Sequence, residues 1–400
     1  DIRLLGTFLG RVIKDQEGSV FFEIVEKFRL LSKSTLSDKN KSKVFSKISK
    51  EVKKLSPEKT FKITRAFSHI LNLMNLAESL DASRKLNEYE NPYFKSKNQN
   101  LFIEDIIEGL FKNKNITNNK IYNLATKLDI GIVLTAHPTE VKRRTLIQKY
   151  ANLIEIMEQR HLYKKYPSKI IELDRKLYSE IAIIWKTDEL KRTKPSPLDE
   201  ARWGLAVIED SLWDTIPKVY KRLNDIFRKN LKKDLPRDFN PIQFGSWMGG
   251  DRDGNPNVTA EVTKKVILFS RWQAAKLYEK ELTKLIQDLS MEECSTKIKR
   301  ATGNSYEPYR VYLRPIRDKV RLTHQLIENH LNKNVPLDEK KLIQNKNEIT
   351  LPLREVRNSL KVNRGEHIAN ADLLDLMRRV RCFGINLARL DIRQEADRHE

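Results

Sequence analysis

The stretch VLTAHPTE, residues 133–140, joins an apolar, strand-forming segment to the start of a helix. The apolar segment begins at Ile130, and Pro138 fixes the backbone at a position where helices commonly begin. His137 is therefore expected at the amino end of a helix that follows directly on a strand. Two later segments repeat this order of strand, loop and helix, which predicts parallel βαβ units.

Three short apolar segments are the candidate strands: 130–135, 242–248 and 387–392. Each is joined to a polar motif, TAHPTE at the first, GGDRDGNP (249–256) at the second and RLDIRQE (389–395) at the third. In barrels and in open α/β sheets, ligands bind at the carboxyl ends of the strands. We therefore expect the three motifs to form the walls of one active site.

Most of the rest of the chain has helical patterning. Ser56 and Pro57 are typical of an N-cap and a first helical position, and Gly384 is expected to end the helix before the third strand. Further helices are expected at roughly 140–160, 168–188, 198–228, 260–288, 308–332 and 367–383. Stretches rich in Lys and Asn, at 91–100, 112–120 and 342–349, are expected to be surface loops.

The strands are few for the length of the chain. A standard (β/α)8 barrel uses about 250 residues for its eight strands, whereas about three strands are expected here in 400 residues. The chain also begins without methionine and ends within the helix expected after the third strand. We therefore expect it to be the first part of a longer protein.

The composition is that of a highly charged globular protein. Lys and Arg number 76 against 54 Asp and Glu, a formal net charge of +22, which a nucleic acid, a polyanionic substrate or a lysine-rich surface can each explain. The basic residues are spread over almost every segment, without aromatic residues spaced as stacking platforms, so nucleic-acid binding is not favoured.

Several other classes of protein are not expected from the sequence. It has no apolar run long enough to cross a membrane and no secretory leader. Its two cysteines, Cys294 and Cys382, lie far apart, which fits a reducing cytoplasm and argues against disulfides or a zinc site. No P-loop, GxGxxG or HExxH motif is present.

The TAHPTE motif suits acid–base chemistry on an anion. The amino end of a helix disfavours a protonated imidazole and favours an anion, so His137 is expected to be neutral there. A neutral histidine facing an anion can accept a proton from it or donate a hydrogen bond to it. A histidine satisfied in the core, or capping its own helix, is the alternative interpretation.

The GGDRDGNP loop suits the binding of an oxyanion. Its two glycines allow a sharp turn or a close approach, and Arg252 can hold an anion while the flanking aspartates orient it. A calcium loop is excluded, because Pro256 stands where such a loop needs glycine and Val262 where it needs a bidentate glutamate. An Asx-rich turn without a ligand is the alternative interpretation.

The RLDIRQE motif places Arg389, Asp391 and Arg393 on one face of the third strand. An arginine at the end of a buried strand needs an acid or an anionic ligand beside it. Asp391 or Glu395 is the structural partner expected from the sequence, and a bound anion is the functional one.

Together the motifs resemble the phosphoenolpyruvate carboxylase family in order and approximate spacing. The segment TDEL…TKPSPLDEAR (187–202) and the helical stretches DIRLLGTFLGRVI (1–13) and TRAFSHILNLMNLAE (64–78) also resemble that family, so the similarity covers essentially the whole chain. It implies a predominantly α-helical protein with an elaborated (β/α)8, TIM-type barrel core. An amino-terminal helical region is then expected at 1–128 and the first part of the barrel domain at 129–400.

The resemblance implies a cytoplasmic, allosteric homotetramer that replenishes oxaloacetate, with no nucleic-acid or membrane partner. Phosphoenolpyruvate and bicarbonate would give oxaloacetate and phosphate through carboxyphosphate and the enolate of pyruvate. By the matching motifs, His137 is the catalytic residue that takes the carboxyl proton of carboxyphosphate. Arg393 is the phosphate-binding arginine, and Trp247 and Arg252 belong to the substrate-binding wall.

Other parts of the family's machinery are implied only in part. Arg143 and Arg144 match positions that bind an activating sugar phosphate in some members, but Lys191 stands where those members carry a further arginine. The ligands of the Mg²⁺ or Mn²⁺ cofactor, the catalytic lysine, the glycine-rich loop and the inhibitor site are expected in a carboxyl-terminal half outside this chain. A non-catalytic helical scaffold and a basic nucleic-acid-binding protein are the alternatives.

Overall fold

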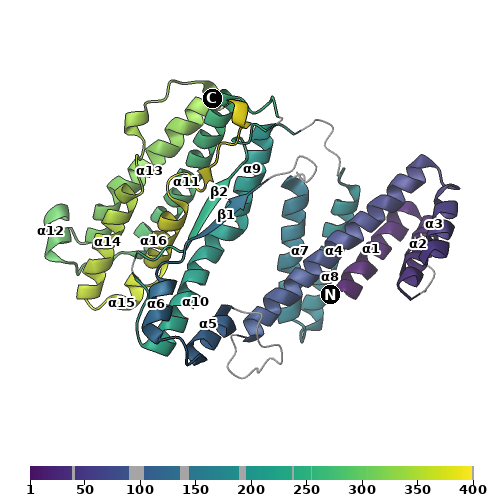
Figure 1. Cartoon of the computed structure of the whole chain (residues 1–400), viewed down its shortest axis with the longest axis horizontal. Coiled ribbons are helices and arrows are strands. Elements are labelled where there is room, and N and C mark those ends of the chain that lie inside the picture. Colours follow the sequence, from purple (N-terminus) through teal and green to yellow (C-terminus); the bar gives the residue numbers. More distant parts are fainter. Residues whose placement is uncertain are drawn as a thin grey trace. The chain divides into compact units, whose positions relative to one another are not determined.

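The computed structural model describes residues 1–37, 41–89, 103–135, 144–188, 195–236, 238–253, 255–303 and 305–398. The chain forms two compact units, shown in Figure 1. The first consists of Asp1–Lys97 and Lys142–Arg192, and the second of Asn98–Val141 and Thr193–Glu400. The expected domain boundary after residue 128 concerns the complete protein and stays a prediction.

The first unit is a bundle of helices. Helix α1 packs against α2, α4 and α8, and α7 packs against α8. The expected start of α4 is confirmed, because Pro57 is its first residue and the backbone N–H of Lys59 donates to Ser56 Oγ at 3.3 Å. The helices are α1 (Ile2–Glu17), α2 (Ser19–Ser37), α3 (Lys41–Val52), α4 (Pro57–Tyr89), α7 (Arg144–Leu162) and α8 (Pro167–Lys186).

The second unit contains a three-stranded parallel sheet. Its strands are β1 (Ile130–Leu134), β2 (Ile242–Ser246) and β3 (Arg389–Leu390), in the order β1-β2-β3. The register pairs Leu134 with Ser246, and Ser246 in turn with Leu390. The three strands and their parallel pairing are thus confirmed, although each strand is shorter than the apolar segment that predicts it.

Helices form most of the second unit. They are α5 (Ile103–Lys112), α6 (Asn118–Ala125), α9 (Pro197–Val207), α10 (Trp213–Leu231), α11 (Ala260–Asp288), α12 (Thr296–Thr302), α13 (Pro308–Lys333), α14 (Asn347–Val362), α15 (Glu366–Ala369) and α16 (Asp372–Phe383). Gly384, with a φ of 60°, ends α16 as expected, and its N–H donates to Val380 O at 3.0 Å. No helix in the described part of the chain is long and apolar enough to cross a membrane.

The prediction of a surface loop at 342–349 is partly wrong. Leu342 and Ile343 are buried, although their neighbours in the sequence are exposed and polar. Each inserts into a different hydrophobic cluster. Helix α14 begins within the same stretch, where the lysine- and asparagine-rich sequence does not predict a helix. Its inner face is apolar with helical spacing and is buried at Ile349, Leu353, Val356 and Leu360.

A π-helical turn, Ile208–Leu212, joins α9 to α10 where the sequence predicts one continuous helix. The buried positions within and beside it are Leu205, Ile208, Trp213, Ile216 and Tyr220. The step from 208 to 213 is five positions, one more than an α-helical face allows, and the π turn accommodates the extra residue. Helices α9 and α10 therefore both direct their buried residues toward the core of the second unit.

Helix α10 also contains a proline. Pro217 has no N–H to donate to the carbonyl of Trp213, one turn earlier. Arg379 Nε, from α16, donates to that carbonyl instead at 2.9 Å. The group released by the proline is thus satisfied by a neighbouring helix.

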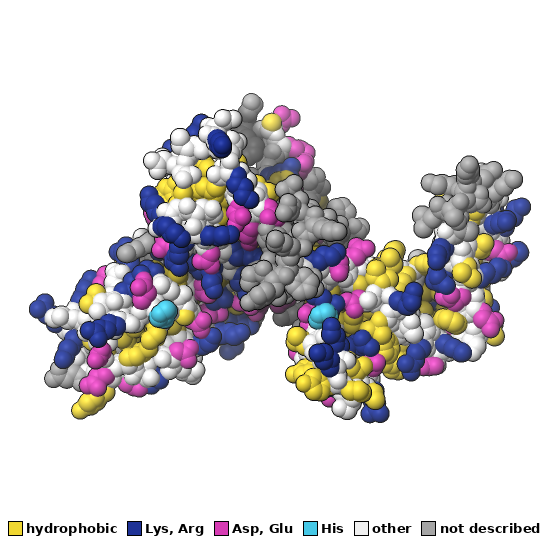
Figure 2. Space-filling model, turned by 90° about the horizontal axis from the view of Figure 1, so that it is seen from below, with side chains coloured by type: hydrophobic (Ala, Val, Ile, Leu, Met, Phe, Trp, Pro, Cys, Tyr) yellow, Lys and Arg dark blue, Asp and Glu magenta, His cyan; other side chains and the backbone are white. Residues whose placement is uncertain are grey.

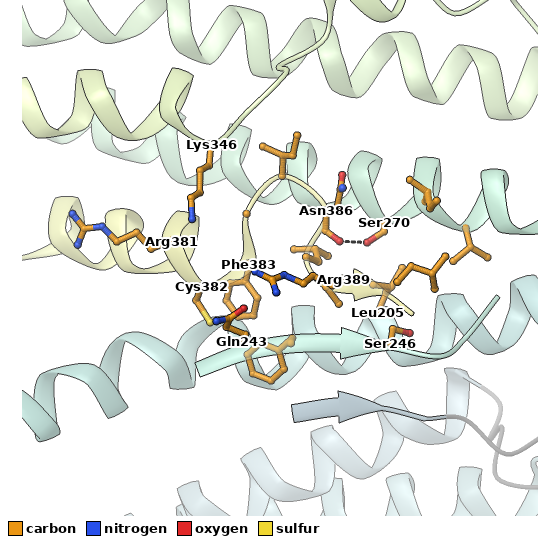
Figure 3. A pocket seen from close by; sticks show the side chains of 18 of the residues that line it. Leu205, Gln243, Ser246, Ser270, Lys346, Arg381, Cys382, Phe383, Asn386 and Arg389 are labelled. Carbon is orange, nitrogen blue, oxygen red and sulfur yellow. Dashed lines mark hydrogen bonds between the residues drawn. The ribbon is translucent and has the colours of Figure 1, made fainter. Parts of the chain in front are cut away.

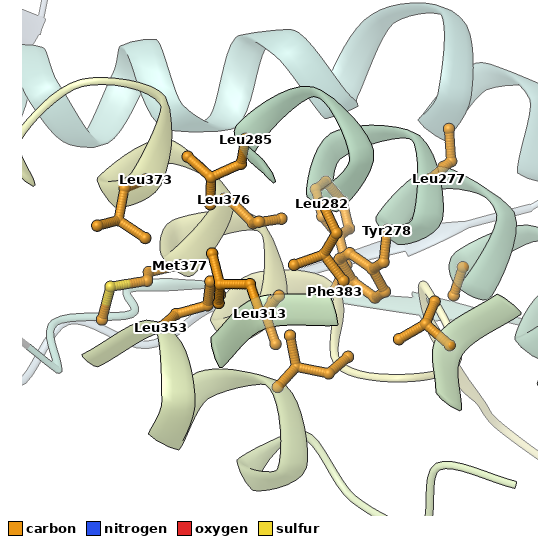
Figure 4. Packing of buried hydrophobic residues seen from close by; sticks show 14 of the residues in the cluster. Leu277, Tyr278, Leu282, Leu285, Leu313, Leu353, Leu373, Leu376, Met377 and Phe383 are labelled. Carbon is orange, nitrogen blue, oxygen red and sulfur yellow. The ribbon is translucent and has the colours of Figure 1, made fainter. Parts of the chain in front are cut away.

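The core of the second unit lies between the sheet and the helices on one of its faces, as Figure 4 shows. Aromatic rings connect the layers: Phe244 of β2 stacks on Phe383 of α16 with centroids 5.4 Å apart, and Phe383 stacks on Trp213 at 5.3 Å. The aliphatic part includes Leu282, Leu313, Leu353 and Leu376. This packing fixes β2 against its helices.

Two leucines of α14 allow a matched test of this core. Leu353 is fully buried, whereas Leu351 is 46% exposed. We expect Leu353→Ala to lower the free energy of unfolding by about 2–5 kcal/mol, because it leaves a cavity. Leu351→Ala should change it by less than about 0.5 kcal/mol. Urea unfolding followed by circular dichroism measures both, and equal effects would contradict the assigned packing.

Candidate active site

The chain turns sharply where it leaves β2. The N–H of Trp247 donates to Leu134 O at 3.1 Å, which extends the β1–β2 pairing by one residue. The N–H groups of Gly250 and Asp251 then both donate to Trp247 O at 2.9 Å. Gly249 has a φ of 80°, and a Cβ there would lie 2.5 Å from Val266 Cγ2, so this turn requires glycine.

The loop then pairs with the segment that follows β3. Arg393 N–H donates to Gly250 O at 3.0 Å, and Arg252 N–H donates to Arg393 O at 2.9 Å. A Cβ on Gly250 would lie only 2.2 Å from Asp391 O, so the two backbones meet at a distance that only glycine permits. The pairing places residue 393 directly beside residue 251.

Arg393 meets two side chains at this point. Its guanidinium carbon lies 4.1 Å from the ring centroid of Trp247, and its Nη1 lies 3.4 Å from Asp251 Oδ2. Both charged side chains are open to solvent, at 42% exposure for Arg393 and 36% for Asp251. Among the described residues, this single long hydrogen bond leaves most of the guanidinium donors for a ligand. Asp251 is a partner that the sequence does not predict.

The rest of the loop is held by Asx turns. Asp251 Oδ1 accepts from the N–H of Asp253 at 3.4 Å, and Asn255 Oδ1 accepts from that of Asn257 at 3.1 Å. The alternative interpretation of an Asx-rich turn therefore accounts for the conformation of the loop. It does not account for an exposed arginine stacked on a tryptophan.

The side chain of Arg252 lies with a different group of residues. It lines a cavity together with Lys264 and Arg271 of α11, and among the described residues neither Arg393 nor Trp247 lines that cavity. The structure thus brings together two of the three residues expected to bind substrate. The third has separate surroundings.

A further cavity, of about 430 Å³, lies beside β2 and β3. Figure 3 shows Gln243, Arg389, Lys346 and Arg381 around it, together with Cys382. Burial raises the pKa of the Cys382 thiol to about 12, so this cysteine is a protonated wall residue rather than a nucleophile. These residues come from four separate segments, and no sequence motif joins them.

Comparison with known proteins decides the family. The family model described as phosphoenolpyruvate carboxylase matches residues 1–400. The chain belongs to the phosphoenolpyruvate carboxylase family. Curated phosphoenolpyruvate carboxylases from Acinetobacter baumannii, Alcanivorax borkumensis and Haemophilus influenzae are 40%, 39% and 37% identical to it over all of this chain. The chain spans 44% of the length of each of these relatives.

Several residues suggested by the resemblance to phosphoenolpyruvate carboxylases lie outside the described part of the structure. These are His137, Arg143 and Lys191, and the side chain of Arg144, the first residue of α7, is not described either. What the structure does place is the end of β1. Because Leu134 pairs with Ser246, the chain enters the TAHPTE motif at the same edge of the sheet as the GGDRDGNP loop.

The described residues contain no group of three or more His, Cys, Asp or Glu side chains arranged to hold a metal ion. The Asp251 carboxylate accepts from the backbone N–H of Asp253 in the Asx turn and contacts Arg393. The described part of the chain therefore does not fit the divalent metal expected for phosphoenolpyruvate carboxylases.

Two glycines of the sheet region allow a test of the close approach. We expect Gly250→Ala to weaken the pairing of the loop with residues 391–393 by about 1–3 kcal/mol, because the new methyl group overlaps Asp391 O. Hydrogen exchange of the Arg393 amide, measured by mass spectrometry, should become faster. Gly131→Ala is the control, since nothing lies within 4 Å of a Cβ there. Equal exchange in both variants would contradict the geometry.

Proposed function

We propose that the complete protein is a phosphoenolpyruvate carboxylase, a lyase that forms oxaloacetate and phosphate from phosphoenolpyruvate and bicarbonate. The observation that carries this proposal is the position of Arg393. It lies at the carboxyl ends of parallel strands, stacked on Trp247 and beside Asp251, in a chain that the family model matches from end to end. Replenishment of oxaloacetate is the corresponding role in metabolism.

Arg393 is proposed to bind the phosphate of phosphoenolpyruvate. Trp247 supports one face of the guanidinium, which fixes its plane, and Asp251 holds one of its nitrogens. The other N–H groups can then form charge-assisted hydrogen bonds with a phosphate in a defined direction. The resemblance also assigns Arg252 to the substrate-binding wall, and this stays a prediction; because its side chain lines a separate cavity, no contact with the substrate is proposed for it.

His137 is proposed to act after the first chemical step. Bicarbonate attacks the phosphorus, the bond to the enol oxygen breaks, and carboxyphosphate and the enolate of pyruvate result. His137 takes the carboxyl proton of carboxyphosphate, which then separates into carbon dioxide and phosphate. The enolate carbon attacks carbon dioxide to give oxaloacetate. A neutral imidazole, as expected at the amino end of a helix, suits this proton transfer.

We further propose that β1, β2 and β3 belong to a (β/α)8 barrel that further chain completes. Their parallel order supports this proposal, as do the apolar side chains of β1, where Ile130 is 45% and Ile132 is 40% exposed. Strands of parallel sheets are normally covered on both faces. A division into 1–128 and 129–400, a homotetramer, and an activator site at Arg143 and Arg144 are part of the same proposal.

The Mg²⁺ or Mn²⁺ of the reaction is proposed to be bound by residues outside the described part of this chain, since that part offers no suitable ligand group. No step above is assigned to the metal. The match to the carboxylase family favours neither alternative function. On the face that Figure 2 presents, Lys and Arg are mixed with Asp and Glu, whereas a nucleic-acid-binding surface is expected to gather basic side chains into one patch or stripe.

The histidine assignment is tested in the complete enzyme. We expect His137→Asn to abolish oxaloacetate formation while phosphoenolpyruvate still binds, because the imidazole acts after the phosphoryl transfer. Bicarbonate-dependent release of pyruvate should survive, and coupled malate and lactate dehydrogenase assays measure the two products. His161→Asn, on an exposed residue of α7, is the matched control. Oxaloacetate formation near the wild-type rate in His137→Asn would reject the assignment.

The arginine assignment is tested by substrate binding. Loss of a charge-assisted hydrogen bond to an anion costs about 2–3 kcal/mol, so Arg393→Ala should raise the Kd for phosphoenolpyruvate roughly 30- to 150-fold. Arg389→Ala removes the same charge from β3 and should change the Kd less than about threefold. An unchanged Kd in Arg393→Ala, with only a lower melting temperature, would show that Arg393 is structural.

A further inference from the structure

The cavity next to Arg252 has an unusual wall. Its volume is about 400 Å³, and it lies between the GGDRDGNP loop, α11 and residues 337–342. Three cationic side chains line it, Arg252, Lys264 and Arg271, against one acidic side chain, Glu339. We call it the Arg252 cavity.

Two of the cations have a buried donor without a partner. The Nε groups of Arg252 and Arg271 are both shielded from solvent and make no hydrogen bond among the described residues. Another nitrogen of Arg271, Nη2, donates to Ile343 O, which anchors that side chain. Buried donors are nearly always satisfied, and an unsatisfied one is costly. Burial also lowers the pKa of Arg271, as expected for a cation that is removed from water.

The wall is attached firmly to the rest of the unit. Lys264 and Arg271 are seven residues apart on α11, which puts them on one face of the helix. Between them and the loop, the buried hydroxyl of Thr263 donates to Gly249 O at 2.8 Å. The cationic groups are therefore held in place by a long helix and by a hydrogen bond to the loop.

The remaining wall is largely apolar and comes from both sides of the cavity. Leu268 of α11 and Leu342 are buried, and Ile267 and Leu337 complete this surface. An inorganic ion would satisfy the arginines but would leave this apolar surface in contact with water. An anion with an apolar body satisfies both.

We infer that the Arg252 cavity binds a small organic anion, a carboxylate or phosphate ester with a short apolar body, whose charged group meets Arg252, Lys264 and Arg271. Guanidinium groups suit this chemistry because they bind carboxylates and phosphates through paired hydrogen bonds. The ligand would be held by the side chain of Arg252, whose backbone N–H donates to Arg393 O. The inference goes beyond the proposed carboxylase reaction, and its test does not depend on activity.

The test is isothermal titration calorimetry on the complete protein, with hexanoate and hexyl phosphate as probes. At least one should bind, and the tighter of the two identifies the anionic group. Arg252→Gln should weaken that binding about tenfold or more, and Lys264→Gln should weaken it several-fold. Lys264→Arg, which keeps the charge, should restore it. Lys265→Gln is the matched control, since Lys265 is exposed on the same turn and pairs with Glu261 at 3.5 Å outside the cavity.

Further titrations distinguish an organic anion from a purely apolar ligand and from an inorganic ion. Hexanol and inorganic phosphate should bind at least tenfold more weakly than the better probe, because hexanol lacks the negative charge and phosphate lacks the apolar body. Saturating phosphoenolpyruvate should leave the probe bound. The inference is overturned if neither probe binds, if Lys265→Gln weakens binding as much as Lys264→Gln does, or if phosphoenolpyruvate displaces the probe. Circular dichroism establishes that each variant is folded.

Discussion

The close approach of two backbone segments at Gly250 is the constraint on which this edge of the sheet depends. Strand β3 is only two residues long, and its pairing with β2 would be weak by itself. The hydrogen bonds of Asp391 N–H to Ser246 O, of Arg393 N–H to Gly250 O and of Arg252 N–H to Arg393 O extend that pairing into the loop. A side chain at position 250 would prevent this extension, because it would occupy the place of Asp391 O.

The loop consequently has two distinct sides. Asp251 and Arg252 are neighbours in an extended, paired segment, so their side chains point to opposite sides. Asp251 meets Arg393 above Trp247, and Arg252 enters the cavity against α11. The contact between Asp251 and Arg393 is exposed and adds little stability, at most about 1 kcal/mol. Its value is positional, since it holds an arginine in one orientation at the open end of the strands.

Local features of this fold are readable from the sequence, and pairings between distant segments are not. The cap at Ser56, the end of α16 at Gly384 and the three apolar strands each depend on a few consecutive residues. The partner of Arg393 depends on the register of two segments 142 positions apart, so Asp251 could not be chosen over nearer acids. In the same way, the spacing of Lys264 and Arg271 predicts one helix face but says nothing about the residues opposite it. The burial of Leu342 and Ile343 is not predicted, because the average composition of their stretch conceals two apolar residues.

The π-helical turn at Ile208–Leu212 adds one residue to the continuous helix that α9 and α10 form. Leu205, Ile208, Trp213 and Ile216 are all buried, although an uninterrupted α-helix would place Trp213 about 140° around the axis from Ile208. A chain shorter by one residue in this turn would keep both faces in place with ordinary α-helical hydrogen bonds. The turn therefore takes up one extra residue locally, without displacing the buried faces of α9 and α10.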